Sequence, residues 1–151
     1  DSVASRGLGD VYKRQGVKAA TIFRTNTKQG NVSLVVKNCT FYNLFSGEAL
    51  MRDIIGGTNS FTAENILFAG SGSVKIFNKT SDAPGIINGS KIYSSSDLTV
   101  ANAGEVSTTA LSYSSSQLFP NASSSTDVLD LTFGADIPNE VKIIGDPRWN
   151  K

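Results

Sequence analysis

Two basic residues, Arg52 and Lys75, have the type and spacing best suited to holding an anionic ligand. Each lies in a short apolar segment that predicts a strand, residues 50–55 for the first and 74–77 for the second. If these strands are neighbours, the two cations stack about 4.8 Å apart on an outer face. The alternative is that both are solvated surface charges, which is the usual state of Lys and Arg. We favour solvated charges, and Arg52 and Lys75 are the only candidate substrate-binding residues that the sequence offers.

The composition restricts other chemistry. The chain has no histidine, which excludes a Ser-His-Asp triad, a histidine general base and the usual zinc ligands. Paired carboxylates could hydrolyse a glycosidic bond, but the acidic residues are scattered and no acidic pair recurs at the spacing of the repeat, so the sequence singles out no such pair. The Gly-Gly-x-Gly-x-Asp calcium repeat is also absent. The sequence therefore identifies no catalytic residue and no metal site, and it predicts no cofactor for this chain.

Charge and hydropathy narrow the class of partner. The net charge is +1 with no basic cluster, whereas a nucleic-acid-binding surface concentrates Lys and Arg on one face. No apolar run reaches the roughly 18–20 residues that a membrane-spanning helix needs. Charged residues make up only 18% of the chain, and Ser, Thr, Asn and Gly are abundant. This composition favours many short strands joined by polar turns.

Three segments align as copies of one strand-like repeat. Any binding site in this chain depends on how these strands are arranged. They are Ser33–Phe41 (SLVVKNCTF), Ser60–Phe68 (SFTAENILF) and Gly85–Tyr93 (GIINGSKIY). Their closing aromatic residues are spaced by about 25 residues, a period typical of repeats that stack into a continuous core. The regular leucine spacing of leucine-rich repeats is missing. We therefore expect an all-β solenoid, and a β-sandwich with coincidental spacing is the alternative.

The alignment also predicts which residues stack from one copy to the next. One register position holds Leu34, Phe61 and Ile86. Another holds Asn38 and Asn65, with Ser90 in the third copy. Asparagine tolerates the left-handed backbone conformation and bonds to nearby groups, so aligned asparagines predict a ladder of side chains at a turn.

A resemblance to a known family supports the solenoid. Residues 32–44, VSLVVKNCTFYNL, resemble a rung of bacterial pectate-lyase-like β-helices, and residues 62–70, TAENILFAG, repeat the pattern. The ending Gly145-Asp146-Pro147-Arg148-Trp149 resembles the C-terminus of an uncharacterised family of such right-handed parallel β-helices from surface polysaccharide-utilisation proteins. Residues 1–15 instead resemble a translated adapter or assembly artefact of metagenomic reading frames, and a disordered N-terminal segment is the alternative.

The resemblance implies an organisation and a function. We expect about three rungs of β-helix over residues 16–116 and a C-terminal cap over residues 117–151 that folds back over the last rung. The implied protein is secreted or at the cell surface, with its signal peptide upstream of this chain, and binds or processes polysaccharide, above all acidic glycans. An active lyase performing uronate β-elimination, with calcium as a cofactor of the longer protein, is one alternative. A structural or adhesive solenoid is the other, and the oligomeric state stays open.

Two single residues have a structural and a chemical interpretation. Cys39 is the only cysteine, so it cannot form an internal disulfide, and we favour a small core residue over a reactive thiol. Trp149 follows Pro147, which cannot donate to a strand ladder. We favour Trp149 as part of the cap over a residue that stacks on a sugar ring.

Overall fold

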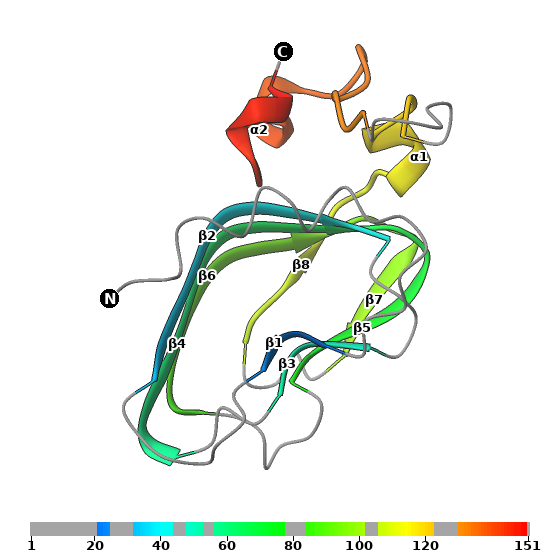
Figure 1. The fold of residues 1–151 in the computed structure, drawn as a ribbon. Coiled ribbons are helices and arrows are strands. Elements are labelled where there is room, and N and C mark those ends of the chain that lie inside the picture. Colours follow the sequence, from blue (N-terminus) through cyan, green and yellow to red (C-terminus); the bar gives the residue numbers. More distant parts are fainter. Residues whose placement is uncertain are drawn as a thin grey trace.

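The protein is rich in strands, with short helical turns near its C-terminus (Figure 1). The computed structural model describes residues 21–24, 32–43, 48–52, 56–77, 84–101, 106–122 and 130–150, and the segment 1–15 lies outside them. The elements in chain order are β1 (Thr21–Arg24), β2 (Ser33–Tyr42), β3 (Glu48–Arg52), β4 (Gly56–Ala69), β5 (Gly72–Phe77), β6 (Pro84–Ser94), β7 (Leu98–Ala101), β8 (Thr109–Ala110), α1 (Ser115–Leu118), α2 (Asn139–Lys142) and a 3-10 turn (Pro147–Trp149).

The strands form two parallel sheets, and successive strands along the chain belong alternately to one sheet and to the other. One sheet has the order β1-β3-β5-β7 and the other has the order β2-β4-β6-β8, so each strand pairs with the strand two further along the chain. Every pairing between these strands is parallel. Parallel pairing contradicts the alternative of a β-sandwich, whose sheets are antiparallel. Each repeat thus supplies one long strand to one sheet and one short strand to the other.

The long strands bend at one residue each. Asn38, Asn65 and Lys91 have φ values of 51°, 54° and 53°, in the left-handed region that L-residues seldom adopt. We call the part before the bend the first limb (residues 33–37, 60–64 and 86–90) and the part after it the second limb (residues 39–42, 66–69 and 92–95). Figure 1 shows the strands running up the first limb, turning, and continuing along the second limb.

The register confirms the predicted alignment of the first two copies and corrects the third. Leu34 pairs with Phe61, as predicted, but Phe61 pairs with Ile87 rather than Ile86. A slip of one residue moves a side chain to the opposite face of a strand. Ile86 is accordingly 47% exposed, whereas Ile87 packs against the core. The closing residue that aligns with Phe68 is Ser94 rather than Tyr93, so the second period is one residue longer than predicted.

The core lies between the two sheets. Alternate residues of the long strands point inward and meet side chains of the short strands. The Phe41 and Phe68 rings stack with centroids 5.3 Å apart, and Phe61 meets Phe77 edge-on at 5.8 Å. Stacking one repeat on the next therefore buries a continuous row of aromatic and aliphatic side chains.

A second apolar cluster lies on the outside of the second limb. Leu67 and Ala69 point away from the core, yet both are buried because Leu118, Phe119 and other residues of the C-terminal tail (115–122 and 130–150) cover them. Figure 1 shows α1 and α2 beside the outer surface of the second limb. The tail therefore does not lie where we expected it, as a cap over the last rung. The tail covers the side of the sheet and reaches back to the first repeat, where Tyr42 meets Phe119 edge-on at 6.0 Å.

Candidate functional site

The predicted binding pair, Arg52 and Lys75, lies on neighbouring strands but is not in register. Lys75 of β5 pairs with Ala49 of β3 and with Ala101 of β7, while Arg52 pairs with Arg24 of β1. The expected direct stacking of the two cations is therefore wrong, because they are offset along the sheet. Lys75 alternates with buried Val74 and Ile76 and so lies on the outer face of its sheet. Of Arg52 the structure describes the strand position alone.

The predicted asparagine ladder is confirmed in the first two repeats. The Asn65 Nδ2 donates to the Asn38 Oδ1 at 2.9 Å, across the bends of neighbouring strands. In the third repeat the equivalent residue is Lys91 rather than Ser90, because Ser90 pairs with Glu64 and Ile92 pairs with Ile66. The three bends are thus occupied by two asparagines and a lysine.

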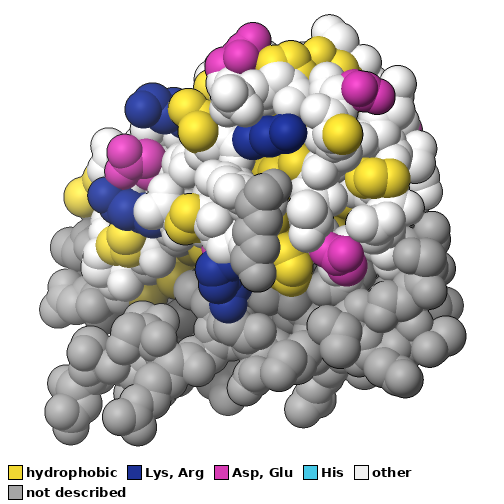
Figure 2. Space-filling view, turned by 90° about the horizontal axis from the view of Figure 1, so that it is seen from above, with side chains coloured by type: hydrophobic (Ala, Val, Ile, Leu, Met, Phe, Trp, Pro, Cys, Tyr) yellow, Lys and Arg dark blue, Asp and Glu magenta, His cyan; other side chains and the backbone are white. Residues whose placement is uncertain are grey.

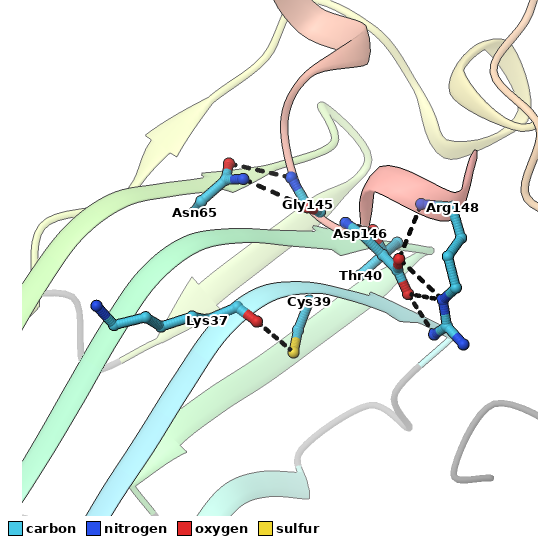
Figure 3. A network of polar contacts seen from close by, with 7 residues as sticks. All are labelled: Lys37, Cys39, Thr40, Asn65, Gly145, Asp146 and Arg148. Carbon is cyan, nitrogen blue, oxygen red and sulfur yellow. Dashed lines mark hydrogen bonds and ion pairs between the residues drawn. The ribbon is translucent and has the colours of Figure 1, made fainter. Parts of the chain in front are cut away.

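The C-terminal motif docks on this ladder (Figure 3). The Gly145 N–H donates to the Asn65 Oδ1 at 3.1 Å, and the Asn65 Nδ2 also donates to the Gly145 carbonyl oxygen at 3.3 Å. The next amide, that of Asp146, donates to the Thr40 Oγ1 at 3.0 Å. The buried Asp146 carboxylate in turn accepts from the Arg148 amide and guanidinium. The motif that carries the family resemblance is therefore a docking segment for the tail.

The surroundings of Cys39 and Trp149 favour a structural role for both residues. Cys39 is buried in the core between the sheets, and its Sγ donates to the Lys37 carbonyl oxygen at 3.1 Å (Figure 3). Trp149 is partly buried against the outer apolar cluster of the tail. Its packing there favours the tail-docking interpretation over sugar stacking.

A second polar cluster anchors the start of the tail. The Asp97 Oδ1 accepts from the Ser115 amide at 2.9 Å, and its Oδ2 accepts from the Ser115 hydroxyl at 2.6 Å. Partial burial acts to raise the pKa of Asp97, but the hydrogen bonds from Ser115 and Ser95 outweigh it and leave the pKa below its ordinary value. The cluster holds α1 next to the turn before β7, a structural role.

Unlike that of the second limb, the outer face of the first limb is covered by no described element. We call this surface the open face, and among the described elements none packs on it (Figure 1). Its register rows, read across β2, β4 and β6, are Ser33–Ser60–Ile86, Val35–Thr62–Asn88 and Lys37–Glu64–Ser90. Neighbouring strands lie about 4.8 Å apart, so the rows form a flat array of hydroxyl, amide, charged and aliphatic groups.

Interactions along the rows order this array. The Ser60 hydroxyl donates to the Ser33 Oγ at 3.0 Å. The Lys37 ammonium lies 2.7 Å from the Glu64 carboxylate, and both side chains are about half exposed. The hydrogen bond from Lys37, its charge and the more distant charge of Lys91 lower the pKa of Glu64 below its ordinary value. Two cations and one anion therefore stand at the edge of the open face nearest the bend.

The surface on the tail side carries mixed charges. Figure 2 shows the molecule from the tail side, where basic and acidic side chains are interspersed among uncharged ones. Within the described ranges, no three His, Cys, Asp or Glu residues gather as metal ligands, and no helix is long and apolar enough to span a membrane. No protein-family model matches the sequence, and neither a curated protein nor a solved structure is significantly similar to it.

Proposed function

We propose that this chain is part of a right-handed parallel β-helix, secreted or at the cell surface, whose open face binds acidic polysaccharide. The alternation of strands between two parallel sheets supports the β-helix. Crossover connections between parallel strands are almost always right-handed, which supports the handedness. The observation that carries the binding proposal is the contrast between the limbs of the same strands: the tail buries the outer face of the second limb and leaves that of the first uncovered.

The groups on the open face suit a sugar chain. Serine and threonine hydroxyls and the Asn88 amide both donate and accept hydrogen bonds, as sugar hydroxyls do. Val35 and Ile86 are 49% and 47% exposed and offer aliphatic contacts to the C–H faces of sugar rings. Lys37 and Lys91 outnumber Glu64, so the charge there favours an anionic chain.

The test is the affinity of the whole chain for polygalacturonate and alginate, compared with the neutral polymer dextran. Thr62 is the central residue of the open face, paired with both Val35 and Asn88. We expect Thr62→Glu to weaken binding of the acidic polymers about tenfold or more. The new carboxylate would face the carboxylates of the polymer, and like charges brought together at an interface cost several kcal/mol. The matched control is Thr99→Glu on β7, an exposed threonine of the other sheet.

The outcomes separate the candidate functions. Tight binding that Thr62→Glu weakens and Thr99→Glu leaves intact supports the proposal. No binding of any acidic polymer, or equal loss in both variants, would contradict it. Growth of ultraviolet absorbance from unsaturated uronates in the same samples would favour the lyase instead.

A further inference from the structure

Lys91 stands where the other two repeats have asparagine. It occupies the bend of β6 with a φ of 53°, matching Asn38 and Asn65 at the bends of β2 and β4. Asparagine tolerates this left-handed conformation because its short polar side chain bonds to nearby groups, whereas lysine has no such compensation. Residues that the surrounding fold holds in such sparsely populated conformations cluster at active sites, ligand-binding sites and switch regions.

The charge of Lys91 is available in a way that the charge of Lys37 is not. Lys37 forms a close ion pair with Glu64. Lys91 is exposed, and no acidic group of the described residues lies within 4.0 Å of its ammonium. The adjoining residue, Ser90, pairs with Glu64 in the last row of the open face. The net positive charge of this edge therefore resides on Lys91.

We propose that Lys91 is the specificity-determining residue of the open face, and that its ammonium binds the carboxylate of a uronic acid unit in the bound glycan. This inference rests on the proposed function of the open face. A charge-assisted hydrogen bond from the ammonium is stronger than a bond between neutral groups, so it selects carboxylated sugars over neutral ones. The hydroxyl and amide groups of the rows then contact the neighbouring sugar units.

Lys91→Asn tests the proposal, because it restores the residue of the other two bends while removing the charge. Relief of the left-handed lysine is expected to raise the urea midpoint of unfolding, so lost binding cannot be attributed to misfolding. We expect affinity for polygalacturonate to fall about tenfold, the value of one charge-assisted hydrogen bond, and affinity for fully methyl-esterified pectin to stay unchanged. Lys91→Arg retains a cation and is expected to retain most of the binding.

Lys75→Asn is the matched control, since Lys75 is an outward-facing lysine on the other sheet. Equal affinity of Lys91→Asn and the unaltered protein for polygalacturonate, or an equal loss in Lys75→Asn, would overturn the role of Lys91. If Thr62→Glu still weakened binding in that case, the open face would remain the binding surface. Absence of polygalacturonate binding by the unaltered protein would overturn both proposals.

Discussion

Gly145 occupies a position in which a side chain has no room. Its φ is +81°, and a Cβ there would overlap the Thr40 Oγ1 and lie 3.1 Å from the Leu67 Cβ. Glycine is the residue that adopts such a φ without steric cost. The backbone of the tail can therefore approach β2 and β4 closely enough for the amides of residues 145 and 146 to reach Asn65 and Thr40.

We expect Gly145→Ala to lower the free energy of unfolding by about 2 kcal/mol or more, because strained backbone and overpacking each cost on that order. Urea unfolding followed by circular dichroism measures the change. Gly85→Ala is the control, at an exposed position of β6 without a positive φ. Equal stability of the two variants would contradict the docking role of Gly145.

Single residues were only partly predictable from the sequence. The asparagine ladder was predictable because Asn38 and Asn65 share both a spacing and a conformational preference. Lys91 was missed because no propensity places a lysine in a left-handed bend. The Gly145-to-Trp149 motif was singled out, but its partners are more than 70 residues away in the sequence, so its docking site was not evident from local pattern.

At the scale of the strands, the sequence pattern determined the pairing wherever apolar and polar residues alternate clearly. The first two repeats share a serine, an asparagine and a phenylalanine at the same spacing, and their predicted register is confirmed. The third repeat has two adjacent isoleucines, Ile86 and Ile87, either of which could face inward. Aligning Tyr93 with Phe68 selected the wrong one, whereas packing of Ile87 and Ile92 on the core decides the register.

The predicted stacking of Arg52 on Lys75 was wrong for a related reason. The short strands β3 and β5 offer few landmarks, and their register depends on which residues complete the core. Met51 pairs with Phe77 and Ala49 with Lys75, so Arg52 and Lys75 do not face each other. Strand order alone could not reveal this offset.

The contact between Asp97 and Ser115 joins the turn before β7 to α1, and it makes stability depend on pH. Folding lowers the pKa of Asp97, so its ionised carboxylate stabilises the folded chain. This contribution is fully present above the ordinary value of 3.8 and is lost as the pH falls through the lower folded-state value. We expect Asp97→Asn to remove this part of the pH dependence.

Urea unfolding between neutral pH and pH 3 measures this contribution of Asp97, as the difference in the free energy of unfolding between wild type and Asp97→Asn. The difference is expected to shrink as the medium becomes acidic. Ser115→Ala removes the hydroxyl donor to the Asp97 Oδ2 and is expected to reduce the same difference. A gap between wild type and Asp97→Asn that stays constant down to pH 3 would contradict the assignment.

At the scale of the molecule, one set of strands serves two opposite purposes along its length. The second limb is buried on both faces, by the core and by the tail, which fixes the long strands in place. The inner face of the first limb packs on the core, and its outer face presents rows of polar, charged and aliphatic side chains. The strands alone form the proposed binding surface, without a loop. Its place is set by the tail, which covers the outer face of the second limb and not that of the first.

Binding of acidic polysaccharide to the open face is tested most directly by mapping the amide chemical-shift changes that a polygalacturonate oligosaccharide causes in the protein. We expect shift changes concentrated in the first limb of β2, β4 and β6 and at Lys91, with residues Asn139 to Trp149 unaffected. Changes centred on the tail or on the outer face of β5 and β7, or no changes at saturating oligosaccharide, would contradict it.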